Sequence, residues 1–165
     1  MEADFYSKVF DFDDWDFADH IFKMAAGRWG EFSFDRFAND INYKVQRYNS
    51  RFYTRETSGV DAFAFAWGNE NNWLVPPICL VCRVLSHMFM CKAKGVLVVP
   101  KWKSALYWPL LWDDKNQCFN NFVTDYLEFK NPKNFFVAGS DKNSILTKSP
   151  FHSSVIILRL DYSNQ

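Results

Sequence analysis

The feature that most constrains this chain is a strand, a double proline and a long apolar segment in direct succession. An apolar stretch at 73–75 runs into Pro76 and Pro77, and apolar residues then continue over 78–90. A second strand is expected at 95–99, which completes a βαβ unit with two parallel strands. Ligands of open α/β sheets bind outside the carboxyl ends of the strands, so the proline pair is expected at the rim of any site.

The chain before this unit predicts a helix and two strands. An apolar stripe at helical spacing indicates a helix that begins at Asp14 or Asp16 and runs to about Ala26. Residues 31–35 alternate polar and apolar and predict the first strand, and a second short strand is expected at 51–54.

The chain after this unit predicts a short helix and two further strands. Residues 101–112 are expected to form a loop and a short helix that Pro109 breaks. Strands at 134–138 and 155–160 are close in sequence and predict an antiparallel hairpin at the edge of the sheet. The whole alternation predicts a small three-layer α/β domain with a mostly parallel sheet and an antiparallel C-terminal edge.

Length and composition indicate one folded domain, residues 14–165, behind an acidic leader, residues 1–13. The chain has 165 residues, of which 48% are hydrophobic and 23% charged, which suits a packed core and argues against disorder. The leader is rich in acidic and aromatic side chains and shows no periodicity. We expect it to be either a partner-binding segment or a solvating one.

Compartment and charge set further bounds. The sequence shows neither a signal peptide nor an apolar run of about 18 residues, so no membrane partner is expected. Four cysteines without a secretory signal favour reduced thiols in an intracellular protein, nuclear or cytoplasmic. The formal net charge is +0, so no overall field attracts nucleic acid.

Four groups of residues occur in an order that resembles a known family. They are Phe34-Asp35-Arg36-Phe37-Ala38-x3-Asn42, Tyr48-x-Ser50, Asp61-Ala62-Phe63-x3-Trp67-x8-Pro76-Pro77, and Val99-Pro100-x-Trp102-x4-Tyr107-Trp108-Pro109-Leu110-Leu111. Together they resemble the domain that follows reverse transcriptase and ribonuclease H in DIRS-type, tyrosine-recombinase retrotransposons. The resemblance covers about residues 14–112 and suggests a retroelement-derived protein.

That retroelement domain is similar to the phage-type Dam family of adenine methyltransferases. The resemblance implies a Rossmann-like sheet of the class I methyltransferase type, with S-adenosylmethionine held at the end of the first strand. It places Asp35 as the acidic contact of the cofactor, with Phe37, Ala38 and Asn42 beside it. Asp61, which precedes the catalytic strand, is expected to join these cofactor-binding residues.

The sequence departs from that family at the catalytic motif. Adenine methyltransferases carry Asp or Asn, two prolines and Tyr or Phe, where this chain has Val75, Pro76, Pro77 and Ile78. The family's polar side chain and a proline carbonyl accept hydrogen bonds from the adenine amino group, and the ring stacks on the flipped base. Val75 offers no acceptor, Ile78 offers no ring, and no glycine-rich loop follows Asp35. We therefore expect a pseudoenzyme and assign no residue a catalytic role.

A basic segment supplies a candidate nucleic-acid surface. Lys44, Arg47, Arg51 and Arg55 are interleaved with tyrosine and phenylalanine residues. In such a segment basic groups contact phosphates while aromatic rings stack on bases. The alternative is a solvated face whose aromatic side chains belong to the core, which the zero net charge favours.

Cys79-x-x-Cys82 has the spacing of a metal or redox site, but it lies within an apolar run. His87 and Cys91 do not share a helical face with both cysteines, and no second cysteine pair completes a set of four ligands. The cysteines are therefore expected to act as small buried hydrophobes, and no metal is expected.

Three functions follow from these observations. The first is a methyltransferase-like domain without catalytic power that binds DNA, RNA or a protein partner. The second is an active S-adenosylmethionine-dependent DNA adenine methyltransferase, in which a backbone carbonyl and a nearby asparagine hold the amine. The third is a pure protein-interaction module, which would bind neither the cofactor nor DNA. Binding of S-adenosylmethionine at equilibrium separates the first two.

Overall fold

The computed structural model describes residues 16–17, 19–39, 41–130, 136–137 and 154–165 of the chain. The acidic leader expected at residues 1–13 lies outside these residues. So do the helix start expected at Asp14 and most of the strand expected at 134–138.

Within the described residues the chain forms three α-helices, two short 3-10 helices and eleven strands. The helices are α2 (Asp19–Trp29), η1 (Ala62–Ala64), η2 (Ile78–Leu80), α3 (Val81–Cys91) and α4 (Trp108–Leu111). The strands are β1 (Asp16–Phe17), β2 (Phe34–Asp35), β3 (Asn49–Ser50), β4 (Gly59–Val60), β5 (Asn71–Leu74), β6 (Lys94–Pro100), β7 (Trp112–Asp113), β8 (Cys118–Phe119), β9 (Val123–Phe129), β10 (Phe136–Val137) and β11 (Val155–Asp161).

The central sheet has five strands in the order β2-β5-β6-β11-β9. β2, β5 and β6 are parallel to one another, whereas β11 runs antiparallel to both of its neighbours, β6 and β9. The chain therefore has a mixed α/β fold, with a mainly parallel sheet and an antiparallel pair of strands at one edge. The βαβ unit expected around the double proline is confirmed as β5, η2 with α3, and β6.

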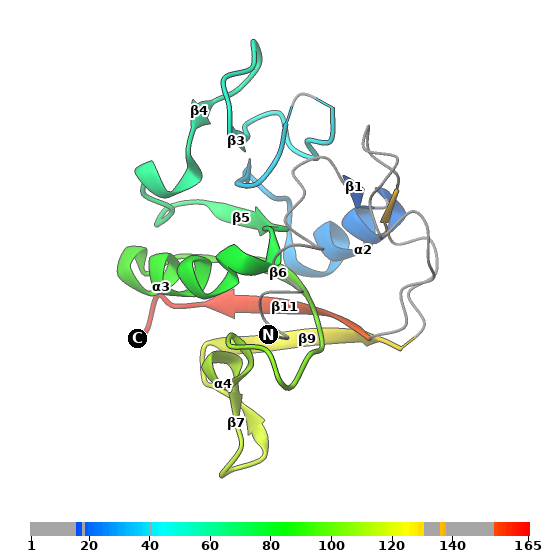
Figure 1. The fold of residues 1–165 in the computed structure, drawn as a ribbon, viewed down its shortest axis with the longest axis vertical. Helices are drawn as coiled ribbons and strands as arrows, with labels where there is room; N and C mark the ends of the chain where they lie inside the picture. The colour runs from blue at the N-terminus through cyan, green and yellow to red at the C-terminus, as the bar shows by residue number, and fades with distance from the viewer. Residues whose placement is uncertain (1–15, 18, 40, 131–135, 138–153) are drawn as a thin grey trace.

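Two further short strands continue the parallel arrangement beyond β2. Asp35 forms a parallel bridge with Tyr48, and β3 pairs in parallel with β4. The amide of Asp35 donates to the carbonyl of Arg47 at 3.0 Å, and the amide of Ala38 donates to the carbonyl of Asn49 at 3.0 Å. The strands β4, β3, β2, β5 and β6 thus follow one another in space with a common direction (Figure 1).

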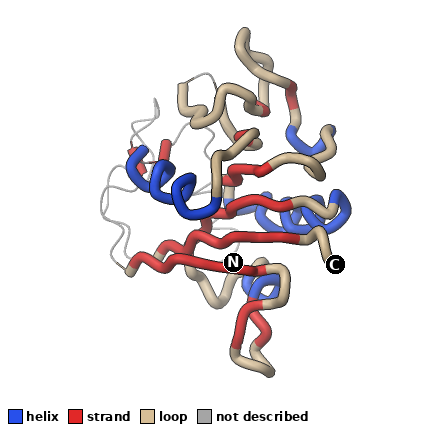
Figure 2. Tube along the Cα trace, turned by 180° about the vertical axis from the view of Figure 1, so that it is seen from behind, coloured by secondary structure: helices blue, strands red, loops and turns tan. Residues whose placement is uncertain are grey.

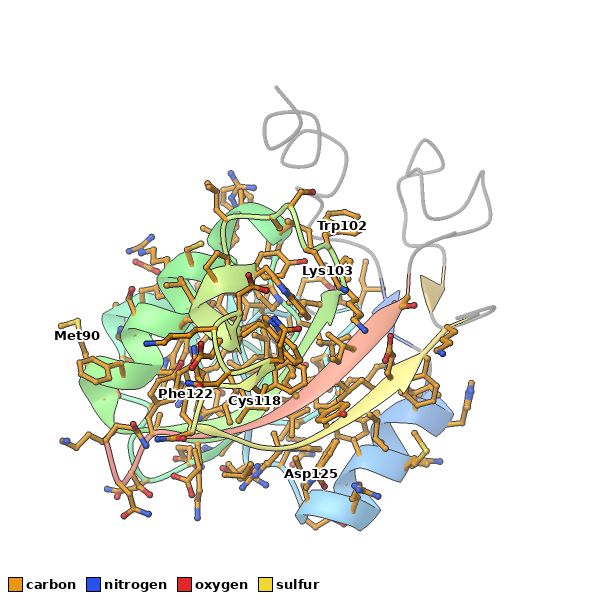
Figure 3. All side chains as sticks on the ribbon, turned by 90° about the horizontal axis from the view of Figure 1, so that it is seen from below. Met90, Trp102, Lys103, Cys118, Phe122 and Asp125 are labelled. Atoms are coloured by element: carbon orange, nitrogen blue, oxygen red, sulfur yellow. The ribbon has the colours of Figure 1, made fainter. Side chains whose placement is uncertain are left out.

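The helices cover both faces of the central sheet. α3 and α4 pack with Leu97, Ile156 and Leu158 on one face, while α2 packs with Val96 and Ile157 on the other. Figure 1 shows α3 in front of the sheet, and Figure 2, the view from behind, shows α2 in front of it. The view from below in Figure 3 shows β11 and β9 between these two layers. The three expected layers are therefore present.

The antiparallel hairpin expected from 134–138 and 155–160 is wrong. β11 lies inside the sheet and pairs with β6 and β9, while β10 pairs with β1 in a separate two-stranded sheet. The physical reason is burial on both faces: consecutive β11 residues from Val155 to Leu158 are all buried, which suits an interior strand. The edge strand is β9, which the sequence reading did not identify.

The other expected elements differ in their bounds. The first helix is α2, which begins at Asp19 and ends at Trp29, and the first strand is confined to β2. No strand forms at 51–54, where the chain bends at 51–52, and β3 ends at Ser50. Pro109 does not break a helix but lies at the start of α4, where its missing amide hydrogen costs nothing.

Candidate functional site

A cavity of about 570 Å³ lies at the carboxyl ends of β2, β3, β4 and β5. The residues that line it all follow one of these strands. They are 36–39 and Asn42 after β2, 50–52 and Thr54 at the end of β3, 61–63 after β4, and Val75, Pro77, Cys79, Leu80 and Arg83 after β5. This volume is within the range of small-molecule sites, which is about 300–1,000 Å³.

The cavity also lies at the point where the order of the strands reverses. From β2 the chain continues to β3 and β4 on one side, and it then returns to β5 and β6 on the other. The loops after β2 and β5 therefore diverge and leave a crevice between them. In open parallel sheets this switch point is where ligands bind.

The loop after β2 is held by the carboxylate of Asp35. Its Oδ1 accepts from the amide of Phe37 at 3.4 Å and its Oδ2 from the amide of Lys44 at 3.0 Å. Asp35 is only 3% exposed and is not among the lining residues. The residue expected as the acidic cofactor contact thus fixes the cavity wall from behind.

Two asparagines complete this loop. The side-chain oxygen of Asn39 accepts from the amides of Ile41 and Asn42, each at 2.8 Å, and that of Asn42 accepts from the amide of Asn39 at 2.8 Å. Both asparagines line the cavity, as do Phe37 and Ala38. Five residues were expected to bind a cofactor. Four of them line the cavity together, namely Phe37, Ala38, Asn42 and Asp61, and the fifth, Asp35, supports the loop from behind.

Asp61 lies in a backbone conformation that side chains other than glycine rarely adopt. Its φ is 63°, its side chain is exposed at the cavity, and its Oδ1 accepts from the amide of Phe63 at 3.1 Å. Such conformations cost about 1–3 kcal/mol and gather at functional sites. The carboxylate is therefore held at the cavity by a local cap and by a strained backbone.

The end of β5 contributes only apolar side chains to the cavity wall before η2. Val75 and Pro77 line it, whereas Pro76 and Ile78 do not. Asn72 does not supply the missing acceptor, because its Oδ1 accepts from Nε of Arg36 and its Nδ2 donates to the carbonyls of Trp67, Glu70 and Lys94. It is fully buried within the sheet.

Arg36 is a buried cation that the sequence reading did not single out. Its Nε donates to Oδ1 of Asn72 and its Nη1 to Oδ1 of Asn49, both at 2.8 Å. The guanidinium lies 3.7 Å from the centre of the Phe34 ring. Burial lowers the pKa of Arg36 to about 10, so it stays protonated at neutral pH. Among the described residues no carboxylate forms an ion pair with it.

Two further arginines line the cavity with their guanidinium groups against aromatic rings. Arg51 lies 5.3 Å from the centre of the Phe52 ring, and Arg83 lies 4.0 Å from that of Phe63. Both arginines are exposed. Arg83 is in the first turn of α3, far along the chain from the basic segment. The sequence therefore gives no sign that it lines the same cavity as Arg51.

The four basic residues expected to form a nucleic-acid surface have different surroundings. Nζ of Lys44 lies 2.7 Å from Asp19, and the guanidinium of Arg47 lies 2.8 Å from the carboxylate of Glu70. Arg51 lines the cavity, and Arg55 is exposed outside its lining. Lys44 and Arg47 therefore each lie in an ion pair, and Arg51 faces the cavity.

None of the four cysteines, all of which lie in the described part of the chain, is joined in a disulfide. Cys79 is exposed and lines the cavity, while Cys82 is half-buried, and burial raises the pKa of its thiol. Nε2 of His87 lies 2.8 Å from the carbonyl of Phe65 and 3.5 Å from Sγ of Cys91. Within the ranges that the structure describes, no three histidine, cysteine or acidic side chains are grouped so as to hold a metal.

Comparisons with known proteins do not assign the chain to a family. Its sequence matches no protein-family model and no curated protein. Among the described residues, no helix is both long and apolar enough to cross a membrane.

Proposed function

We propose that this chain is a retroelement-derived, methyltransferase-like domain that binds nucleic acid at its cavity and does not transfer methyl groups. The observation that carries the proposal is the cavity at the carboxyl ends of four parallel strands, at the point where their order reverses. A nuclear or cytoplasmic location belongs to the same proposal.

The strand order supports a Rossmann-like fold of the class I methyltransferase type. The parallel strands extend from β2 to β3 and β4 on one side and to β5 and β6 on the other. β11 then enters in reverse between β6 and β9. Many doubly wound folds carry an antiparallel strand toward the edge of an otherwise parallel sheet.

The chemistry at the end of β5 supports the absence of methyl transfer. The adenine amino group needs an acceptor that orients its lone pair, and the side chain of Val75 at this place has none. The side-chain oxygens of Asn39 and Asn42 already accept from loop amides. The oxygen of Asn39 accepts two of these bonds and would have to give one of them up to take over the missing contact.

Exposed aromatic rings beside the cavity support binding of nucleic acid. Phe52 lines the cavity and is 67% exposed, although a ring of this size is normally buried. Rings of this kind stack on unpaired bases with little preference for sequence. The arginine next to it supplies a positive charge for the backbone.

The test measures binding of a fluorescently labelled single-stranded DNA to the full chain by anisotropy. Phe52→Ala should weaken binding about tenfold, because stacking of one base contributes about 1–3 kcal/mol. Tyr53→Ala is the matched control, since Tyr53 is adjacent and 80% exposed but does not line the cavity. Equal losses in both variants, or no binding by the wild type, would contradict the proposal.

The same protein preparation separates the two other functions. Transfer of a labelled methyl group from S-adenosylmethionine to adenine-containing DNA would establish the active methyltransferase with a divergent motif. If the chain binds neither DNA nor the cofactor and instead forms a complex with another protein, it is an interaction module.

A further inference from the structure

The charged groups around the cavity are mostly positive. Its lining contains three arginines, Arg36, Arg51 and Arg83, and one acidic residue, Asp61. The carboxylate of Asp35 behind the wall already accepts two backbone hydrogen bonds. A ligand in this cavity therefore meets an excess of positive charge, even though the chain as a whole is neutral.

Arg83 has a geometry that suits an anion. Its guanidinium is stacked on the ring of Phe63, which also lines the cavity, and the side chain is exposed. In the part of the chain that the structure describes, no ion pair neutralises it. Stacking leaves the edge of the guanidinium plane available for two parallel hydrogen bonds to phosphate oxygens.

The rest of the lining suits the other parts of a nucleotide. The rings of Phe37 and Phe63 lie 5.6 Å apart and both pack on Trp67, which gives an apolar wall for a base. The carboxylate of Asp61 is exposed beside them and can accept from a sugar hydroxyl or a base amine.

We infer that the cavity takes one nucleoside 5′-phosphate unit, with its phosphate at Arg51 and Arg83, in preference to S-adenosylmethionine. The inference rests on the proposed function and names the group that the cavity recognises. S-adenosylmethionine carries an ammonium and a sulfonium against one carboxylate, so it is a net cation. Like charges in a cavity repel, and the three arginines therefore select against it.

Calorimetry on the full chain tests the inference with three ligands: 2′-deoxyadenosine 5′-phosphate, 2′-deoxyadenosine and S-adenosylmethionine. The phosphate should strengthen binding about tenfold or more over the nucleoside, since hydrogen bonds to charged groups contribute most. The gain should shrink as salt is added. Equal binding of nucleotide and nucleoside, or tighter binding of S-adenosylmethionine, overturns the inference.

Two variants locate the phosphate. Arg83→Gln should remove most of the difference between nucleotide and nucleoside, while the nucleoside alone binds as before. Arg55→Gln is the matched control, because Arg55 is also an exposed arginine but lies outside the lining. Equal effects of the two variants would mean that the phosphate is bound elsewhere, and the inference would fall.

Binding of a 5′-phosphorylated single strand is measured beside that of its 5′-hydroxyl counterpart. The comparison shows whether the nucleotide comes from a strand end or is free, and it tests the inference separately from the proposed function. Tighter binding of the phosphorylated strand than of the free nucleotide assigns the site to a strand end, and equal binding assigns it to the free nucleotide. If both strands bind equally and Arg83→Gln has no effect, the inference falls while the proposed function stands. If neither strand binds, the proposed function falls.

Discussion

The two halves of the sheet are held together in different ways. In the apolar half, β6, β9 and β11 are each seven residues long and pair along their length. In the polar half, β2, β3 and β4 have only two residues each, and β5 has four. The buried polar or charged side chains among the described residues all belong to the polar half; they are Asp35, Arg36, Asn49, Ser50 and Asn72.

This difference separates stability from function. Apolar packing is not directional, so it stabilises long strands without fixing the position of any one loop. Hydrogen bonds from buried side chains are directional, and a fully satisfied network specifies one arrangement. Among the described residues no buried side-chain nitrogen or oxygen lacks a partner. The cavity is built on the half whose loops this network fixes.

The largest effect is expected from Leu158→Ala in the apolar half. Leu158 is fully buried at the centre of β11, between Leu97 and Tyr126 in the sheet. Removing a buried leucine leaves a hole and should lower the free energy of unfolding by about 2–5 kcal/mol in urea titrations. Thr124→Ala on the exposed side of β9 serves as control. A loss of less than about 1 kcal/mol would contradict the division between the halves.

A smaller but more local effect is expected from Asp35→Ala in the polar half. The variant leaves the amides of Phe37 and Lys44 without their acceptor, which should cost about 1–3 kcal/mol. Hydrogen exchange should accelerate in residues 37–44 before it does so in β6 and β11. Uniform acceleration throughout the sheet would show that Asp35 supports the whole fold and not this loop.

A third test concerns the polar contact that joins α2 to the apolar half. Arg28 and Trp29 donate to the carboxylate of Asp125 on β9, on the side of the sheet where α2 lies (Figure 3). The hydrogen bond from Arg28 is the main cause that lowers the pKa of Asp125 from 3.8 to about 2.

Because the pKa of Asp125 is lower in the folded chain, its contribution is complete above the unfolded value of 3.8 and disappears as the pH falls toward about 2. The pair is largely exposed to solvent, which screens it, so the contribution should be small. Asp125→Asn should remove that part of the acid dependence in urea titrations between these two pH values. An unchanged acid profile would show that the ion pair does not stabilise the fold in solution.

The smallest effect on stability is expected from Asp61→Asn. Asparagine tolerates a positive φ and keeps an oxygen for the amide of Phe63. The free energy of unfolding, measured in urea titrations, should therefore change by less than ~0.5 kcal/mol. The substitution removes the one carboxylate of the lining, so binding of deoxyadenosine phosphate should strengthen by about twofold to fivefold. Asparagine keeps an oxygen that can accept from a sugar hydroxyl or a base amine, so weaker binding would show that this contact needs the negative charge of the carboxylate.

The sequence predicted the elements whose signal is continuous burial. The βαβ unit at 73–99 was identified because apolar runs interrupted by prolines have few alternatives. The sequence does not predict β9, because its positions are only half-buried or exposed and include the charged residues Asp125 and Glu128. β11 was placed at an edge because its nearness to 134–138 along the chain outweighed the burial pattern of its own residues.

The sequence predicts those site residues that belong to local motifs. It does not predict those that reach the site from separate segments of the chain. Asp61 and the residues from Phe37 to Asn42 follow strands directly, so their gathering at one edge could be expected from the fold class. Arg83 joins Arg51 only because α3 starts beside the loop after β3, which no spacing in the sequence reveals. Arg36 looks like a surface residue until its neutral partners, Asn49 and Asn72, are seen in space.

The reversed position of β11 has a consequence for how the chain folds. β6 and β9 do not pair with each other, and each is completed only by residues 155–161. During synthesis these residues follow both partners, so an apolar edge of β6 stays unpaired until they have been made. Pairing over such separations is slow, and an open apolar edge invites association with other chains. We therefore expect truncation before Val155 to give an aggregating chain, and folding to finish only after this strand is released.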